Sequence, residues 1–266
     1  MNHLFFIVIA GQMFGGAITL PFYVLGTTLR QLNGSANDPP LIRWLLSWNW
    51  DWIVSMSYKR MNTVPTPHPN THPLIGRGYM LANHRSFADF SVDPYLSNAT
   101  GIARGMVLAV TLFTGLQALL EHRIMFISRG KTNAATVAAQ MIRTMERPQN
   151  PIDRYIFYPE GTRRQYQTLS GPDELLGYFR KGLLLTLYQH ERAKSRGDQL
   201  PFQVQIAMRK ELFINEKRME CGYGIDVPYT RGKPLYAADH ATDDLFLHAV
   251  AEEWFRQYVE VGGVVG

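Results

Sequence analysis

The stretch Tyr79-Met80-Leu81-Ala82-Asn83-His84-Arg85-Ser86 passes from a short apolar run directly into a polar cluster. An apolar run of this length predicts a buried strand, here over residues 79–82. In an α/β sheet, binding and catalytic sites lie beyond the carboxyl ends of the strands. The polar residues that follow this strand are therefore the first candidates for a functional site.

The alternation of apolar runs and helical segments continues along the chain. Further strands are predicted at residues 124–128, 155–158 and 202–207. Helices are predicted at residues 133–146, 174–192 and 242–259, the first of them capped by Thr132 or Asn133. Strand–helix alternation at these spacings predicts an α/β fold with a mostly parallel central sheet flanked by helices.

The N-terminal region differs in composition. Residues 4–29 contain no charged side chain, and a helix of that length would reach about 39 Å, enough for a hydrocarbon core of about 30 Å. Gly15, Gly16 and Pro21 would weaken or kink such a helix, so a re-entrant or tilted segment is the alternative. No Lys or Arg precedes the apolar run, which argues against a cleavable signal peptide.

A second helix, predicted at residues 41–58, places Trp44, Trp48 and Trp52 on one face. Tryptophan is favoured at the membrane–water boundary because its ring is apolar and its N–H needs a polar partner. A Trp face packed on the domain core is the alternative. The two segments together predict an N-terminal two-helix membrane-anchoring motif.

The predicted organisation is a membrane-associated hairpin at residues 1–60, a linker at 61–77 and an α/β domain at 78–266. The Pro-rich linker carries His68 and His72, which are expected in a solvated loop because further metal ligands are missing nearby. Lys and Arg side chains follow the first apolar run and hardly precede it, which places the α/β domain on the cytoplasmic side.

The charge balance favours an anionic partner. The chain has 27 Lys and Arg against 22 Asp and Glu. It shows neither a basic block with interleaved aromatics nor a Cys/His zinc pattern, so nucleic acid is not expected as a partner. Anionic lipid is the expected partner instead. Cys221 is the single cysteine, which excludes an intrachain disulfide. This fits a reducing compartment, although an exoplasmic protein can also lack disulfides.

His84 and Asp89 are the candidate catalytic pair. Histidine titrates near neutrality and can act as a general base, while a carboxylate on its other ring nitrogen holds the tautomer and stabilises the imidazolium. Asp89 can do this if a turn or a helix start brings it back over His84. The pair requires no metal ion.

Basic residues at the ends of the later strands suit a phosphate group, because guanidinium forks bind its oxygens bidentately. The available set is Arg129, Arg163, Arg164 and Lys181. Surface solvation is the alternative for Arg164. Glu160-Gly161-Thr162 reads as a tight turn in which Gly161 permits close approach of the backbone.

Three ordered blocks resemble the first three sequence blocks of the glycerolipid acyltransferases. The blocks are Asn83-His84-x4-Asp89, Phe126-Ile127-Ser128-Arg129 and Tyr158-Pro159-Glu160-Gly161-Thr162-Arg163. Phe179-Arg180-Lys181-Gly182 resembles the basic element after the third block, and Gly232-Lys233-Pro234-Leu235 resembles the Gly-x-Pro strand near the end. The resemblance runs from about Gly78 to the C-terminus. It is greatest to the 1-acylglycerol-3-phosphate (lysophosphatidic acid) acyltransferases, whose bacterial members carry an N-terminal two-helix anchor.

The chain departs from that family pattern at two positions. Val204-Gln205-Ile206 stands where the fourth block usually has a proline between aliphatic residues. Arg104 is the nearest counterpart of a lysine that often precedes the second block. The first departure bears on the acyl pocket and on the identity of the acceptor.

The resemblance implies transfer of a fatty acyl chain from acyl-CoA, or acyl carrier protein, to the free hydroxyl of 1-acylglycerol-3-phosphate. The product would be phosphatidic acid for phospholipid biosynthesis. By resemblance His84 is the general base, Asp89 supports it, and the remaining block residues bind substrate. These binding residues are Asn83, Arg129, Glu160, Gly161, Thr162, Arg163 and Lys181.

The implied partners are a lipid bilayer, a lysophospholipid acceptor and the acyl donor, with acyl-CoA as a co-substrate and no cofactor. The implied location is the endoplasmic reticulum of a eukaryote or the inner membrane of a bacterium. The alternatives are another acceptor, such as glycerol 3-phosphate, dihydroxyacetone phosphate or another lysophospholipid, and a non-catalytic membrane-shaping protein on the same scaffold. A serine hydrolase is disfavoured because the chain has no Gly-x-Ser-x-Gly elbow.

Overall fold

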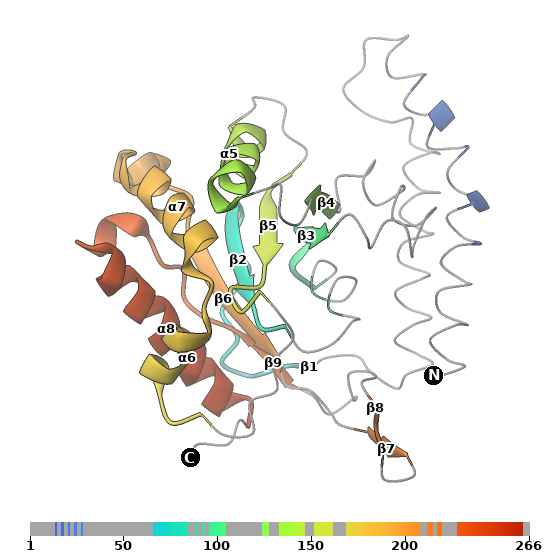
Figure 1. The fold of residues 1–266 in the computed structure, drawn as a ribbon, viewed down its shortest axis with the longest axis vertical. Helices are drawn as coiled ribbons and strands as arrows, with labels where there is room; N and C mark the ends of the chain where they lie inside the picture. Colours follow the sequence, from blue (N-terminus) through green and yellow to red (C-terminus); the bar gives the residue numbers. More distant parts are fainter. Residues whose placement is uncertain are drawn as a thin grey trace. The chain divides into compact units, whose positions relative to one another are not determined.

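The structure is a computed structural model that divides into two compact units, Met1–Arg60 with Ile102–Arg129 and Met61–Gly101 with Gly130–Gly266. It describes residues 66–84, 89, 93, 96–104, 124–127, 133–146, 152–161, 169–207, 212–214, 217–219 and 228–262, together with helical residues 14, 17, 18, 21, 24, 25 and 28. The larger unit holds the helices α5 to α8 and most of the sheet (Figure 1).

A mostly parallel sheet contains seven of the described strands, and most of this sheet belongs to the larger unit. Its strands are β1 (Thr66–Pro67), β2 (Gly78–Ala82), β3 (Thr100–Arg104), β4 (Ile124–Ile127), β5 (Arg154–Phe157), β6 (Phe202–Ala207) and β9 (Pro228–Arg231), in the order β1-β9-β6-β2-β5-β3-β4. β2 runs parallel to both β5 and β6, and β9 is antiparallel to β6. A separate antiparallel hairpin joins β7 (Leu212–Ile214) to β8 (Lys217–Met219). The predicted α/β fold with a mostly parallel central sheet is therefore confirmed, while β9, and β1 parallel to it, run opposite to β6.

The three central strands are buried along their whole length. Every residue of β2, β5 and β6 is buried. A strand that is covered on both faces has a continuous run of apolar residues. Such runs are the feature of the sequence that predicts these three strands. The predicted strand at 202–207 matches β6, and those at 79–82 and 155–158 match β2 and β5 to within one residue.

The helices are α5 (Ala134–Met145), α6 (Pro172–Tyr178), α7 (Lys181–Arg192) and α8 (Asp243–Glu260). The Asn133 side chain caps α5 by accepting from the N–H of Thr136, and Thr242 caps α8 by accepting from the N–H of Leu245. The predicted helices at 133–146 and 242–259 are thus confirmed. α8 packs on β6, where Phe246 contacts Phe202 edge to face with ring centroids 5.0 Å apart.

The single helix predicted at residues 174–192 is wrong, because the chain forms two helices there. Phe179 is extended, with φ −75° and ψ 132°. The N–H of Arg180 donates to the carbonyl oxygen of Pro159 at 2.7 Å. A tertiary hydrogen bond therefore replaces the helical one, and the chain turns between α6 and α7.

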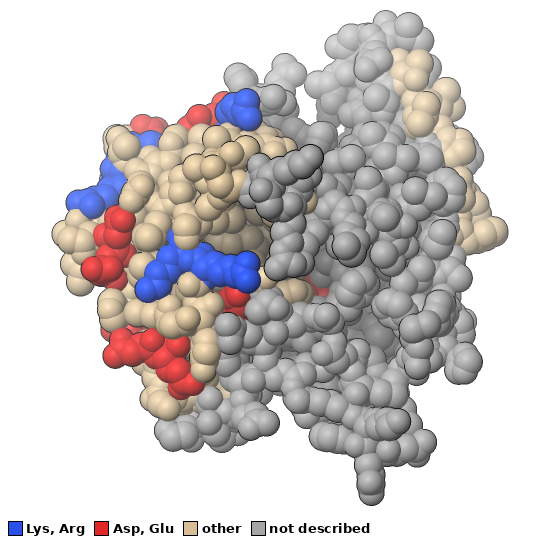
Figure 2. All heavy atoms as spheres, in the orientation of Figure 1, with Lys and Arg blue, Asp and Glu red and all other residues tan. Residues whose placement is uncertain are grey.

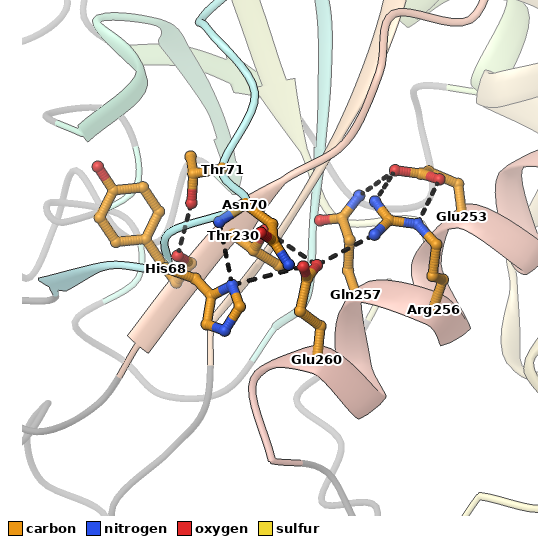
Figure 3. A network of polar contacts seen from close by, with 9 residues as sticks. His68, Asn70, Thr71, Thr230, Glu253, Arg256, Gln257 and Glu260 are labelled. Atoms are coloured by element: carbon orange, nitrogen blue, oxygen red, sulfur yellow. Dashed lines mark hydrogen bonds and ion pairs between the residues drawn. The ribbon is translucent and has the colours of Figure 1, made fainter.

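A polar network joins the segment around β1 to α8 (Figure 3). His68 lies within 3.4 Å of the carboxylate of Glu260, which also accepts hydrogen bonds from Thr230 and Arg256. Thr71 donates to the carbonyl oxygen of Tyr229 at 3.2 Å. The segment predicted as a linker thus contributes a strand and polar contacts to the larger unit. Among the described residues, no group of three or more His, Cys, Asp and Glu side chains could hold a metal ion.

The predicted membrane hairpin lies largely outside the described residues, and the predicted Trp face at residues 41–58 lies wholly outside them. None of the helices in the described part of the chain is long and apolar enough to cross a membrane. The described N-terminal residues are helical and exposed, Phe14 and Leu25 among them with exposed fractions of 70% and 51%.

Candidate active site

The site is built at the carboxyl end of β2, where Asn83 joins this strand to the end of β6. The Asn83 side chain donates from Nδ2 to the carbonyl oxygen of Ala207 at 2.8 Å, and its Oδ1 accepts from the N–H of Ala207 at 3.1 Å. Asn83 is buried, so these two bonds satisfy polar groups that have little access to water. The pairing holds the backbone immediately before His84.

His84 and Asp89 lie together, as their spacing predicts. Asp89 is helical, and its Oδ2 lies 2.9 Å from Nδ1 of His84. The Asp89 side chain is fully buried, whereas that of His84 is 26% exposed. A buried carboxylate needs a hydrogen-bonded partner, and Nδ1–H of His84 supplies it. This tautomer leaves the lone pair on Nε2, the ring nitrogen that can accept a proton.

Glu160 and Tyr158 reach His84 from the end of the neighbouring strand β5. Oε2 of Glu160 accepts a hydrogen bond from the backbone N–H of His84 at 2.6 Å, and Glu160 is 1% exposed. The Tyr158 ring stacks on the imidazole with ring centroids 4.6 Å apart. Tyr158 also donates its O–H to Oδ2 of Asp93 at 3.1 Å. The imidazole of His84 is therefore held at one nitrogen and on one ring face.

The turn after β5 brings a basic residue beside Glu160. Gly161 has φ +64°, in the left-handed region, and its N–H donates to the carbonyl oxygen of Tyr158 at 2.9 Å. A Cβ on Gly161 would collide with the side chain of Arg180. Glycine is thus required here for both conformation and close approach, as the sequence predicts.

Positive charge gathers next to this turn. Arg180 lies in the break between α6 and α7, Lys181 begins α7, and both are exposed. Figure 2 shows a group of Lys and Arg side chains over the connection between these two helices. Positive charge is therefore available close to the carboxyl ends of β2 and β5.

The predicted site residues fall into two groups. The structure brings together Asn83, His84, Asp89, Glu160 and Gly161. The other candidates, apart from Lys181, lie outside the described residues; they are Arg129, Thr162, Arg163 and Arg164.

Sequence reasoning assigned no role to Tyr158, Asp93 or the side chain of Arg180. A signal existed for Asp93, because it follows Asp89 by four residues and side chains at that spacing share one face of a helix. No local signal identifies the stacking of Tyr158 on His84, since it depends on the parallel pairing of β2 with β5.

The comparisons with known proteins agree with this geometry at the level of the fold. No family model matches the chain, and no curated protein matches its sequence. In structure the chain is similar to the crystal structure of the 1-acyl-sn-glycerophosphate (LPA) acyltransferase PlsC from Thermotoga maritima, with a TM-score of 0.53. The sequence identity is 15%, and the match covers 94% of this chain and 97% of that chain.

At this identity the likeness shows a shared fold. The resemblance of the sequence blocks to glycerolipid acyltransferases is thus accompanied by the fold of a solved member of that class.

Proposed function

We propose that the protein transfers a fatty acyl chain from acyl-CoA, or from acyl carrier protein, to the free hydroxyl of 1-acylglycerol-3-phosphate. The observation that carries the proposal is the His84–Asp89 pair at the carboxyl end of β2, 2.9 Å apart. The fold shared with PlsC supports it, because PlsC is an acyltransferase with that acceptor. The product would be phosphatidic acid, a phospholipid precursor.

His84 acts as the general base in this proposal. Its Nε2 takes the proton of the acceptor hydroxyl while that oxygen attacks the thioester carbonyl carbon, and a tetrahedral intermediate forms. The carbon–sulfur bond then breaks, the ester is released, and the imidazolium returns its proton to the thiolate or to water. A thiol has a pKa near 8.5, so the leaving thiolate needs little help from an acid. Asp89 stabilises the imidazolium in the first step.

The remaining residues position the substrates. Arg129, Arg163 and Lys181 are proposed to bind the acceptor phosphate, and Arg180 adds positive charge beside the turn that carries Gly161. Glu160 holds the backbone of His84. Correct placement of the hydroxyl against the thioester is a large source of rate, because it removes the entropy cost of bringing the two together.

A lipid surface is the proposed partner of the N-terminal region. The described helical residues 14, 17, 18, 21, 24, 25 and 28 lie on one face of a helix, and all of them are exposed. Most are apolar, including Phe14, Ile18, Val24 and Leu25. An apolar stripe at helical spacing is suited to the surface of a bilayer. A membrane location, with the larger unit on the cytoplasmic side, is part of the proposal.

A different acceptor is the second candidate, favoured by one observation. Gln205 is buried on β6 at the position where the family pattern usually has a proline between aliphatic residues. Glycerol 3-phosphate or another lysophospholipid would use the same base and the same donor. A membrane-shaping protein without turnover is disfavoured by the intact His84–Asp89 pair.

The proposal is tested with the purified full chain, a radiolabelled acyl chain carried by CoA or by acyl carrier protein, and a panel of acceptors in mixed micelles. The panel contains 1-acylglycerol-3-phosphate, glycerol 3-phosphate and lysophospholipids with other headgroups, and the labelled products are separated by chromatography. His84→Ala is the matched control, and it should lower turnover at least about 10²-fold, as expected for a lost general base. Absence of a labelled lipid with every acceptor and donor would contradict the proposal.

A further inference from the structure

Gln205 and Arg231 carry buried polar atoms that have no hydrogen-bond partner. Both side-chain amide atoms of Gln205 and Nε of Arg231 are buried. Two other such atoms in the described part of the chain, on Trp254 and Gln257, belong to α8. A buried polar group without a partner costs free energy, so a cluster of three on two facing residues requires an explanation.

The two residues lie side by side on one face of the sheet. Gln205 of β6 is opposite Arg231 of the antiparallel strand β9 and next to Ala82 of the parallel strand β2. Directly opposed residues direct their side chains to the same face. Phe202 contacts Phe246 of α8, so the alternate residues of β6, Gln205 among them, face away from this helix.

This face is also the one that leads to His84. Ala82 belongs to a buried cluster with Met80 and Ile156, and Tyr158 packs against this cluster. Tyr158 in turn stacks on His84. His84 is two residues beyond Ala82, and Asn83 between them pairs with Ala207, two residues beyond Gln205 on β6. Ala82 contributes only a methyl group between His84 and Gln205.

Gln203 shows that an unpartnered glutamine is not a general property of this face. Gln203 lies on the same strand and the same face, two residues before Gln205. Its Nε2 donates to the carbonyl oxygens of Pro73 at 2.8 Å and Gly232 at 2.9 Å, and its Oε1 accepts from the N–H of Ile75 at 3.2 Å. One glutamine is therefore fully used by the protein and the other is left available.

The available groups define the chemistry of an occupant. Nε of Arg231, whose guanidinium lies 5.4 Å from the centroid of the Tyr229 ring, and Nε2 of Gln205 are donors and suit anionic oxygens. Oε1 of Gln205 needs a hydroxyl or an amide N–H. Burial lowers the pKa of Arg231, which reflects the cost of holding its charge away from water. A nearby anion would offset that cost.

We propose that Gln205 and Arg231 bind the polar headgroup of a phosphate ester whose reacting end lies at His84. This inference rests on the proposed function for the role of His84. The phosphate oxygens accept from Arg231 and from Nε2 of Gln205, and a hydroxyl or amide of the same ligand donates to Oε1. The ester is either coenzyme A of the donor or the acceptor, whose phosphate Gln205 and Arg231 would then share with Arg129, Arg163 and Lys181.

The test measures binding to the purified full chain by calorimetry. The two probes are 1-hexanoyl-glycerol 3-phosphate, which is short enough to stay monomeric, and coenzyme A. Gln205→Met removes the amide at similar size, and Gln205→Glu places a carboxylate beside Arg231 that competes with the anion. Both variants should raise the Kd of one probe about tenfold to hundredfold, the loss expected for one charge-assisted hydrogen bond, and leave the other unchanged.

Gln203→Met is the matched control. It should lower the melting temperature because it leaves partner groups unsatisfied, while the Kd of both probes stays within about twofold. Gln205→Met should not lower the melting temperature, because no partner is lost. The proposal is overturned if the wild-type chain binds neither probe, if neither Gln205 variant changes a Kd, or if Gln203→Met weakens binding as much as Gln205→Met.

Turnover measured in parallel separates this inference from the proposed function. Binding that depends on Gln205, without turnover of any acceptor, contradicts the acyltransferase proposal and supports the headgroup site. Turnover together with Kd values that do not change in the Gln205 variants supports the acyltransferase proposal and contradicts the headgroup site.

Discussion

The backbone N–H of His84 donates a hydrogen bond to the buried carboxylate of Glu160, which lies 76 residues further along the chain. The bond joins the ends of β2 and β5 and so links two of the sequence blocks directly. A carboxylate in this position fixes the backbone that carries the proposed base, while Asp89 fixes its ring.

Glu160→Gln should weaken this link. A bond to an ionised carboxylate is about twice as strong as a neutral one, so we expect a loss of about 1–3 kcal/mol in the free energy of unfolding, together with lower turnover. Denaturant unfolding and initial rates measure the two effects. Glu146→Gln is the control, because Glu146 is 49% exposed and its pairs with Lys194 and His190 should each contribute at most about 1 kcal/mol. Equal losses in both variants would contradict a special role for Glu160.

Asp89→Asn should reduce kcat by about 10²- to 10⁴-fold, although the side chain hardly changes in size. The amide can donate to Nδ1 and so favour the tautomer that leaves Nε2 protonated and unable to act as a base. Initial rates with labelled acyl-CoA measure the effect, and circular dichroism checks the fold. Because the two residues act as a unit, adding Asp89→Asn to a His84→Ala chain should lower kcat almost no further. A kcat within a few-fold of the wild type would exclude the paired mechanism.

Gly161→Ala should destabilise the protein by about 1 kcal/mol or more, because φ is +64° and the new Cβ meets Arg180. A second substitution, Arg180→Ala, in the Gly161→Ala chain should restore the stability lost to the collision. The loss of stability due to the positive φ should remain. Gly177→Ala is the control, since a Cβ in that position of α6 meets nothing within 4 Å and the change should stabilise the helix. Additive effects of Gly161→Ala and Arg180→Ala would show that the two residues do not touch.

His240 should make stability depend on pH. Burial lowers the pKa of His240, so the folded chain binds a proton there less readily than the unfolded chain. As pH falls below the ordinary histidine pKa, the unfolded state gains the proton first and the stability falls. His240→Gln should therefore show a smaller drop in melting temperature between pH 7.5 and pH 5 than the wild type. An identical drop in both proteins would contradict the prediction.

The exposed N-terminal stripe should bind lipid. Replacing Phe14 and Leu25 together by Asp should lower the affinity for anionic vesicles at least about tenfold, because two large apolar side chains can no longer enter the bilayer surface. Co-sedimentation with vesicles measures the effect. Leu245→Asp on α8 is the control, because Leu245 is 54% exposed but lies outside the stripe. Equal loss in the control would point to a nonspecific charge effect.

Several parts of the fold could be predicted from local sequence. β2, β5 and β6 are continuous apolar runs because the sheet is covered on both faces, and the cap Asn133 lies where a short polar side chain precedes a helical pattern. The break between α6 and α7 could not be predicted in this way. It depends on the hydrogen bond from Arg180 to Pro159, a contact with the distant turn after β5.

The sequence by itself determined the strand ends that carry polar residues and the spacing of His84 and Asp89, because both are properties of short segments. Only the tertiary structure decided that Tyr158 and Glu160 meet His84, that Asn83 pairs with Ala207, and that Gln205 faces Arg231. These contacts depend on which strands are neighbours and in what register, and register is set by packing between segments far apart in the chain.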